Sequence, residues 1–153
     1  MKVACSSGLM CMVFAVILTC GCSGDGKIKT NIVEGTVTYN GQPLVGATVN
    51  FHPTDGGNQG YGNTDVQGRY KLQTLLGQAD AGTTAGEYVV TISHYDNIPT
   101  GRKIQGDDGS MLDETVSKPG IPEAYMDRAS TPFKRTVVSG RNTFDFALTS
   151  DGQ

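Results

Sequence analysis

From residue 31 onward, apolar and polar residues alternate with a period of two, and this pattern constrains the fold more than any other feature. The clearest instance is the run from Gly86 to Ser93, in which Tyr88, Val90 and Ile92 share one face. Successive side chains of a strand point to opposite faces, so this alternation predicts half-buried β-strands. We expect about seven such strands, over residues 33–39, 47–52, 61–64, 69–72, 86–93, 136–138 and 143–148.

Turn residues separate these predicted strands. Asn40-Gly41 is a strong hairpin-turn dipeptide, and Asp65-Val66-Gln67-Gly68 combines a capping carboxylate with a glycine that tolerates positive φ. We interpret Gly35, Gly46 and Gly86 as further bends or turns. No segment has a convincing helical period. The pattern therefore predicts an all-β protein, a single Greek-key β-sandwich.

The segment 95–135 does not fit the alternation and is predicted to be a long irregular loop. It holds four of the six prolines of the chain. Its middle, residues 101–118, is the most polar stretch and the strongest candidate for disorder. A loop of this length is unusual in a compact domain, so we expect it to be functional or partly mobile.

All four cysteines, Cys5, Cys11, Cys20 and Cys22, lie in the first 22 residues, so no disulfide can form within the predicted sandwich. Lys2 precedes an apolar run over residues 9–18, which is typical of an export signal. That run is shorter than the roughly 20 apolar residues of a spanning helix. An uncleaved membrane anchor is the alternative interpretation.

The segment Leu18-Thr19-Cys20-Gly21-Cys22 resembles a bacterial lipobox. That resemblance implies attachment of diacylglycerol to the cysteine thiol, cleavage before the cysteine and acylation, for instance with palmitate, of the new amine. We assign Cys22 as the lipidated residue because small Gly21 precedes it; Cys20 is the alternative. The predicted organisation is a lipoprotein signal peptide at 1–21, a tether at 22–30, the sandwich at 31–149 and a tail at 150–153.

Three stretches of the predicted sandwich together resemble one family. Residues 33–49 resemble "G-x-V-x-x-x-G-x-P-L-x-G-A-x-V", residues 64–70 resemble "T-D-x-x-G-x-Y", and residues 85–92 resemble "A-G-x-Y-x-V-x-V", with Ile92 at the last position. The chain is similar to bacterial envelope lipoproteins with a carboxypeptidase regulatory-like domain, a transthyretin-like (prealbumin-like) β-sandwich. The resemblance implies a binding or scaffolding module rather than a catalyst. It assigns no chemistry to the matched residues, which form turns and core.

Few residues suggest chemistry. His52 falls in the outward phase of its strand and His94 at the end of another, and two histidines do not make a metal site by themselves. Asp107, Asp108, Asp113 and Glu114 lack the spacing of a calcium loop and are interpreted as solvated acids. We therefore expect no catalytic residue, no metal and no cofactor.

These observations predict a lipid-anchored protein of the cell envelope, on the non-cytoplasmic face of a membrane, with the outer membrane favoured over the inner. Its expected role is non-catalytic: structural, or binding a ligand or an envelope protein. A net charge of −3 argues against nucleic-acid binding. The alternative function is a carbohydrate-binding module, in which the tyrosines able to stack on sugars would be Tyr61, Tyr95 and Tyr125.

Overall fold

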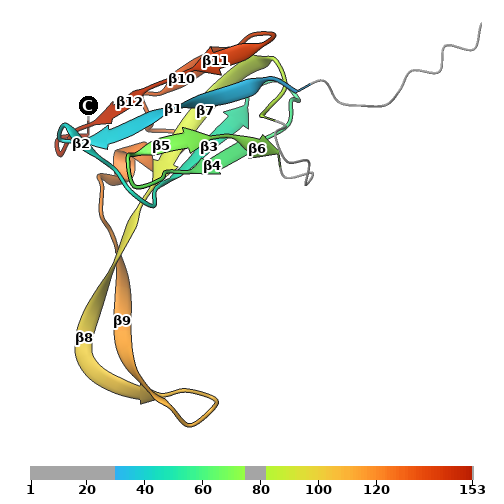
Figure 1. The fold of residues 1–153 in the computed structure, drawn as a ribbon. Helices are drawn as coiled ribbons and strands as arrows, with labels where there is room; N and C mark the ends of the chain where they lie inside the picture. The colour runs from blue at the N-terminus through green and yellow to red at the C-terminus, as the bar shows by residue number, and fades with distance from the viewer. Residues whose placement is uncertain (1–29, 75–81, 153) are drawn as a thin grey trace, which may run out of the picture.

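The computed structural model describes residues 30–74 and 82–152, and these residues form a β-sandwich with a long projecting hairpin (Figure 1). The prediction of an all-β sandwich is confirmed. The predicted signal peptide, most of the tether and Cys22 lie outside the described residues. No helix in the described part of the chain is both long and apolar enough to cross a membrane.

The first sheet is organised around β1 (Ile32–Tyr39). Two strands from the C-terminal end, β11 (Arg141–Thr143) and β12 (Phe146–Leu148), pair with it in parallel along one edge. On its other edge β1 pairs antiparallel with β2 (Gln42–Pro43) and β5 (Arg69–Lys71). The chain therefore begins and ends its folded part in the same sheet.

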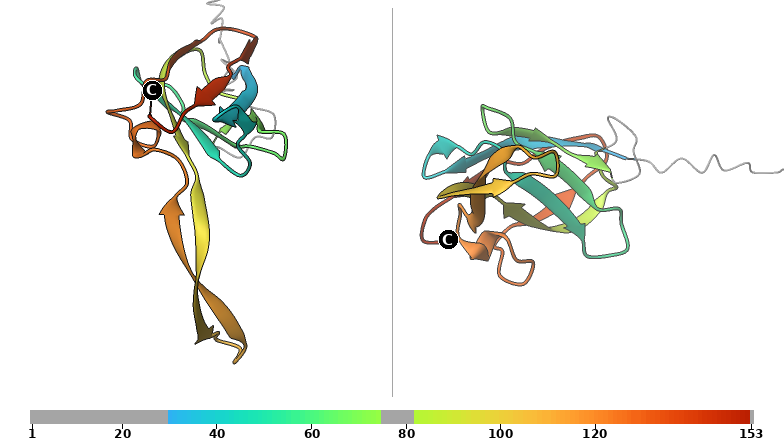
Figure 2. Two further views of the ribbon diagram at one scale, coloured as in Figure 1. Left: turned by 90° about the vertical axis from the view of Figure 1, so that its left-hand side faces the viewer. Right: turned by 90° about the horizontal axis from the view of Figure 1, so that it is seen from below.

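The second sheet has the order β10-β7-β3-β4-β6. Its strands are all antiparallel to their neighbours, and their bounds are β3 (Thr48–Pro53), β4 (Gly60–Asn63), β6 (Gln73–Thr74), β7 (Gly86–Ser93) and β10 (Lys134–Val137). Asn50 lies opposite both Tyr61 and Thr91, so these three residues form one row across β4, β3 and β7. Figure 2 shows the two sheets facing each other.

The core lies between the sheets, and most of its residues are ones that the alternation assigned to the inner faces; Tyr125 and Val137 are additions, and Phe144, which was assigned inward, is only partly buried. The fully buried large side chains are Tyr88, Tyr125, Phe51, Phe146, Leu72, Ile92, Leu148, Val33, Val37, Val49, Val90 and Val137. Tyr125 comes from a single-turn 3-10 helix, η1 (Glu123–Tyr125), and stacks on Phe133 with ring centroids 5.5 Å apart. This core needs no disulfide to hold the sheets together.

The prediction of an irregular loop at 95–135 is wrong for most of its length. Residues Tyr95–Gln105 and Met111–Pro119 form two strands, β8 and β9, which pair only with each other. The hairpin, called the arm below, leaves the end of the sandwich away from the start of β1 and runs across the direction of that strand (Figures 1 and 2). Its prolines, Pro99 and Pro119, are tolerated because both strands of a two-stranded sheet are edge strands.

The described residues contain twelve strands where about seven were expected. The arm accounts for two of the difference, and β2 and β6 are two-residue pairings too short to predict. The predicted strand at 143–148 is interrupted, because Asp145 Oδ1 accepts hydrogen bonds from Thr36 N at 2.8 Å and Thr36 Oγ1 at 2.7 Å. Between β11 and β12, the side chain of Asp145 thus takes the place of a backbone carbonyl in bonding to β1.

Candidate functional site

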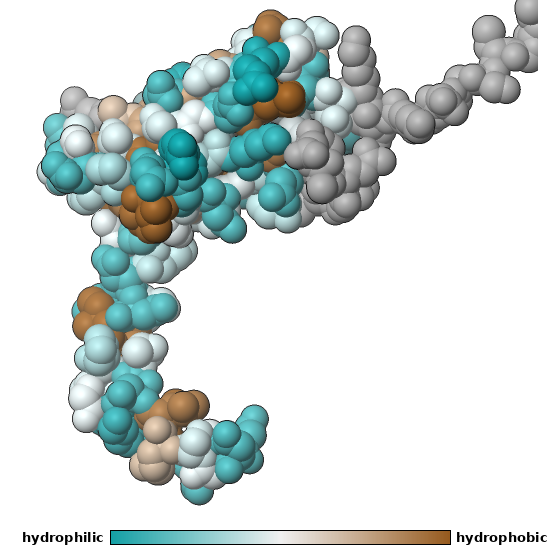
Figure 3. Space-filling model, in the orientation of Figure 1, coloured by the Kyte–Doolittle hydropathy of each residue, from teal (hydrophilic) through white to brown (hydrophobic). Residues whose placement is uncertain are grey.

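One face of the arm is aliphatic, and the two strands that carry it pair with no other strand of the described chain. Ile98 lies opposite Val116, and Ile104 lies opposite Leu112. The four side chains are 45%, 46%, 46% and 51% exposed, respectively. Exposed apolar residues grouped on one element mark interaction surfaces more often than isolated ones do. Figure 3 shows apolar patches along the arm, separated from those of the sandwich. We call these four residues the aliphatic face.

An ion pair divides the aliphatic face into two halves. Arg102 Nε lies 2.8 Å from Glu114 Oε2, and Thr100 Oγ1 donates to the same oxygen at 2.6 Å. The hydroxyl of Thr100 and the guanidinium of Arg102 lower the pKa of Glu114, which is therefore ionised at neutral pH. Glu114 lies two residues from both Leu112 and Val116, so the period of the strand places it on their face. From the root of the arm to its tip, the face therefore consists of an apolar pair, a charged pair and a second apolar pair.

The opposite face of the arm is mostly polar, with Met111 as an exposed apolar exception, and the tip is polar. Lys103 Nζ lies 2.6 Å from Asp113 Oδ1 on that opposite face. At the tip, Asp108 Oδ1 accepts a hydrogen bond from Ser110 N at 3.0 Å, and hydrogen bonds from Ser110 lower the pKa of Asp108. With Asp107 beside it, the tip carries two carboxylates. The basic residues of the arm, Arg102, Lys103 and Lys118, instead lie across the hairpin from Glu114, Asp113 and Asp96.

The root of the arm is tied to the sandwich by a small group of residues. Gly120 N donates to His94 O at 3.0 Å, and His94 Nε2 lies 3.3 Å from Asp96 Oδ1. A Cβ at Gly120 would lie 2.7 Å from His94 Cδ2 and from Asp96 Oδ2, so the two strands cross closely at this point. The close crossing fixes where the arm leaves the sandwich.

Beside the root, the outer face of the second sheet forms a polar hollow of about 480 Å³. Its lining residues are Asn50, His52, Gln59, Thr91, Ser93, Tyr95, Met126, Asp127 and Arg128. Tyr95 is 56% exposed, and it brings an aromatic ring to a surface rich in hydrogen-bonding groups. An exposed aromatic ring beside amide, hydroxyl and charged groups can bind a polyhydroxylated ligand.

His52 lies on the floor of this hollow, and its pKa is lowered from the ordinary value. Its Nε2 lies 2.9 Å from Thr91 Oγ1. Partial burial lowers the pKa of His52, and the positive charge of Arg128 lowers it further. His52 is therefore neutral at pH 7. Its Nε2 atom shares a hydrogen bond with the hydroxyl of Thr91 and is not paired with a carboxylate of the described residues.

The three tyrosines proposed from the sequence as ligand contacts do not form one site. Tyr95 lines the hollow, and Tyr61 is half-buried on the same sheet, opposite Asn50. Tyr125 is fully buried in the core and cannot stack on a ligand, which corrects its assignment as a possible contact. Its hydroxyl bonds Thr149, so its polar end is used within the fold.

The acidic residues of segment 107–114 do not converge. Asp113 and Glu114 pair with Lys103 and Arg102 on opposite faces of the arm, and Asp107 and Asp108 lie at its tip. Among the residues that the structure describes, no group of three or more His, Cys, Asp or Glu side chains could hold a metal ion. Cys22, the assigned lipidation residue, lies outside those residues.

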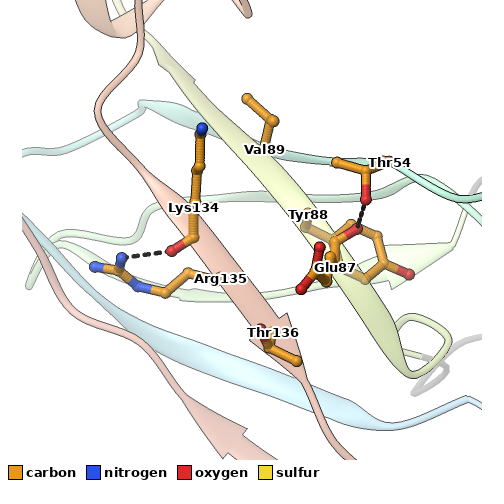
Figure 4. A pocket seen from close by; sticks show the side chains of 7 residues that line it. All are labelled: Thr54, Glu87, Tyr88, Val89, Lys134, Arg135 and Thr136. Atoms are coloured by element: carbon orange, nitrogen blue, oxygen red, sulfur yellow. Dashed lines mark hydrogen bonds between the residues drawn. The ribbon is translucent and has the colours of Figure 1, made fainter.

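A second hollow, of about 280 Å³, lies over the pairing of β7 with β10 (Figure 4). Thr54 Oγ1 donates to Glu87 O at 3.2 Å, and Arg135 Nη1 donates to Lys134 O at 2.8 Å. The charged ends of Glu87 and Lys134 point away from each other in Figure 4. These side chains converge on no common point, so the hollow lacks the arrangement of a binding site.

The arm residues are the functional candidates that the sequence analysis missed. Charged residues fall between the aliphatic ones, and Pro99 and Gly101 interrupt the pattern, so the segment has the composition of a loop. A local pattern in the sequence does point to a hairpin. Gly106-Asp107-Asp108-Gly109-Ser110 is a turn sequence, and it is flanked by Ile104 on one side and by Leu112 and Val116, four residues apart, on the other.

Comparison with known proteins identifies no family. No protein-family profile matches the chain, and no curated protein matches it. Two solved structures are similar at 17% identity and a TM-score of 0.37: a 9R-lipoxygenase from Cyanothece PCC8801 and a chlorocatechol 1,2-dioxygenase from Pseudomonas putida. The lipoxygenase match covers 79% of this chain and 16% of the lipoxygenase chain, and the dioxygenase match covers 82% of this chain and 62% of the dioxygenase chain. This chain therefore spans less than two thirds of either. Likeness of this degree supports no functional argument.

Proposed function

We propose that this protein is a lipid-anchored, non-catalytic protein of the cell envelope that binds another protein through the arm. The observation that carries the proposal is the aliphatic face, four half-exposed side chains on a hairpin whose strands pair only with each other. An isolated two-stranded hairpin is at best marginally stable in water. A partner that covers this face would both stabilise the arm and bury its apolar surface.

The composition of the arm favours a protein partner over insertion into a membrane. The tip, which would enter a bilayer first, carries Asp107 and Asp108, and hydrogen bonding keeps Asp108 ionised. Carboxylates are costly in the hydrocarbon region and are repelled by anionic headgroups. Ile104 and Leu112 lie behind that acidic tip, where a protein surface can reach them.

The sequence motif at Cys22 supports the anchoring part of the proposal. A diacylglycerol thioether together with an acylated amine would provide the several lipid chains that stable membrane attachment requires. The arm leaves the sandwich at the end away from the start of β1, so an anchor preceding β1 leaves the arm accessible (Figures 1 and 2).

The anchoring is tested by the mass and the fractionation of the protein made in a bacterial host with a lipoprotein pathway. We expect acyl mass on the N-terminal peptide, which begins at Cys22, and recovery of the protein with membranes. The Cys22→Ala variant should lose both, whereas Cys20→Ala should retain both. Membrane recovery of Cys22→Ala at the native level would contradict the assignment.

The role of the arm is tested by photo-crosslinking in intact cells. A photoreactive amino acid at Ile104, on the aliphatic face, should give discrete protein adducts. The same amino acid at Val66, which is 73% exposed on the sandwich, is the matched control and should give none. Absence of any protein adduct from Ile104, with the chain present at its normal level, would refute a protein-binding arm.

The hollow beside the root favours a second candidate function, carbohydrate binding. The observation behind it is the exposed ring of Tyr95 at the edge of a surface that contains Asn50, Gln59 and Asp127. Sugar rings stack on exposed aromatic faces while their hydroxyls bond neighbouring polar groups. Titration with envelope polysaccharide fragments should then shift the ring signals of His52 in NMR spectra, and Tyr95→Ala should abolish the shift. Unchanged signals at millimolar fragment would remove this candidate.

A further inference from the structure

We infer that the polar hollow beside the root of the arm binds an acidic saccharide, with the guanidinium of Arg128 on a carboxylate of the sugar and the ring of Tyr95 against a sugar face. The inference rests on the second candidate function, carbohydrate binding, and names the class of sugar. It does not depend on what the arm binds. Its basis is the arrangement of polar side chains around a rigid floor, with the positive charge of Arg128 among them.

The floor of the hollow lies on β3 and β7, two strands inside the second sheet. Asn50 lies directly opposite Thr91, and His52, two residues further along β3, shares a hydrogen bond of 2.9 Å with Thr91 Oγ1. Residues two apart on a strand share a face, so Ser93 lies on the same face as Thr91. Because each of the two strands is paired along both edges, these side chains are held at fixed spacings.

The other lining residues come from three separate segments of the chain. Tyr95 begins β8, Gln59 precedes β4, and Met126, Asp127 and Arg128 follow η1. The volume of about 480 Å³ is within the range of about 300–1,000 Å³ that is typical of small-ligand sites. The hollow therefore has room for a sugar and side chains from several segments to contact it.

Several hydrogen-bonding side chains in the hollow are not used by the fold. In the described part of the chain, no other residue forms a hydrogen bond or ion pair with the side chains of Asn50, Gln59, Ser93 and Arg128. On the neighbouring pairing of β3 with β4, by contrast, Thr48 Oγ1 donates to Asn63 Oδ1 at 3.0 Å. The hollow thus offers amide, hydroxyl and guanidinium groups to a ligand rich in hydroxyls.

The charges of the hollow suit a single carboxylate. Partial burial lowers the pKa of His52, and the positive charge of Arg128 lowers it further, so that charge acts at the floor and the ring is neutral at pH 7. Asp127 carries the opposite charge, but its Oδ1 accepts the N–H of Ala129 at 3.2 Å within its own turn. Arginine can bind a carboxylate through two parallel hydrogen bonds. One cation beside a neutral histidine matches one carboxylate, whereas a phosphate dianion would need more positive charge.

The position of the hollow within the sheet favours a saccharide over an acidic peptide. Extended peptides bind a sheet by adding a strand at an exposed edge, where backbone groups are unpaired. Since β3 and β7 are paired on both sides, the floor offers side chains alone. An exposed aromatic ring beside amide, hydroxyl and guanidinium groups fits the apolar face and polar rim of a sugar.

Matched pairs of sugars test the inference on the full chain, purified in detergent. The acidic probes are trigalacturonate, triguluronate and a hyaluronan tetrasaccharide, and each is compared with the counterpart in which its carboxylates are reduced to hydroxymethyl groups. Binding is read from the ring signals of His52 in NMR titrations up to about 10 mM sugar. We expect at least one acidic probe to bind about tenfold more tightly than its reduced counterpart.

Three variants locate the source of this preference. Arg128→Gln should remove it, because the acidic probe then binds as weakly as its reduced counterpart, whose affinity does not change. Tyr95→Ala should weaken both members of the pair. The matched control is Lys134→Gln, which removes a positive charge from the same sheet outside the hollow and should change neither affinity.

Two results would overturn the inference. Equal affinity within every pair would do so while leaving carbohydrate binding in place, and so would an acidic preference that survives Arg128→Gln. Absence of binding by every probe would refute the inference together with the candidate function on which it rests.

Discussion

The hydroxyl of Tyr70 on β5 donates a hydrogen bond of 2.8 Å to the carbonyl oxygen of Phe144 on the other side of β1, passing over Gly35, the residue that pairs with Tyr70. The same carbonyl lies 1.9 Å from the position that a Cβ would occupy at Gly35. Phe144 N in turn donates to Glu34 O at 2.9 Å. A glycine, a buried phenol and an interrupted strand thus form one junction, which sets where β11 ends and β12 begins.

Removal of the Tyr70 hydroxyl should destabilise the sandwich modestly. Tyr70 is 3% exposed, and burial together with the charge of Asp145 raises the pKa of its phenol well above the usual value, so it is a neutral donor. We expect Tyr70→Phe to lower the free energy of unfolding by about 1 kcal/mol, measured by urea denaturation. Tyr95→Phe, at an exposed ring, is the control and should change nothing.

A side chain at Gly35 should cost more than loss of that hydrogen bond. In Gly35→Ala the new methyl group would collide with the backbone of Phe144, which cannot rotate away as a side chain can. We expect a loss of about 3 kcal/mol or more in the free energy of unfolding. Gly46→Ala is the comparison, because that site has φ +71° but open space around it. It should lose only about 1–2 kcal/mol, and an equal loss in both variants would contradict the steric explanation.

The neutral state of His52 should make the protein less stable in acid. In the folded chain its pKa is below the ordinary 6.5, because of burial and Arg128. The unfolded chain therefore binds more protons between the two pKa values, and stability falls as the pH drops below 6.5 towards the folded pKa. His52→Gln should lose this part of the acid sensitivity.

The pKa itself can be read by NMR, because the chain has only two histidines. The ring signal that is missing in His52→Gln should titrate below pH 6.5 in the native protein. Arg128→Gln should move that midpoint upward, since it removes a nearby positive charge. A midpoint that does not respond to Arg128→Gln would contradict the electrostatic contribution.

The arm should be separable from the sandwich. Its strand residues are exposed, apart from the half-buried Glu114, and contribute nothing to the core. Replacement of residues 96–118 by a short Gly-Ser link should change the free energy of unfolding by less than about 0.5 kcal/mol. Backbone amides of the arm should also exchange with solvent long before those of β3 and β7. A loss of stability near that of Gly35→Ala would show that the arm supports the fold.

The inner faces of the sandwich could be predicted from alternation alone. Val49, Tyr88, Val90 and Ile92 are buried where the period of two places them, because a strand in a sandwich has only two faces and one of them is apolar. The turn glycines Gly41, Gly46 and Gly68 also have the positive φ expected of them. These features are predictable because the physical constraint on each acts between neighbours in the chain.

Features that depend on distant residues could not be predicted from the sequence. Gly35 was interpreted as a bend, yet it lies within β1 and is needed because the Phe144 carbonyl approaches from 109 residues further along. The arm was interpreted as a loop because its strands bury nothing within their own chain. An apolar pattern that serves a contact outside the fold is weaker than one that builds a core.

The sequence by itself determined the all-β class, the inner faces and the turns, since each depends on local backbone preference and side-chain period. It also contains the motif at Cys22 on which the anchoring proposal depends. Only the tertiary structure decided that the polar segment after β7 is a paired hairpin, and that Ile98, Val116, Ile104 and Leu112 share one exposed face. That arrangement depends on strand register, which pairs residues far apart in the chain and cannot be read from either strand separately.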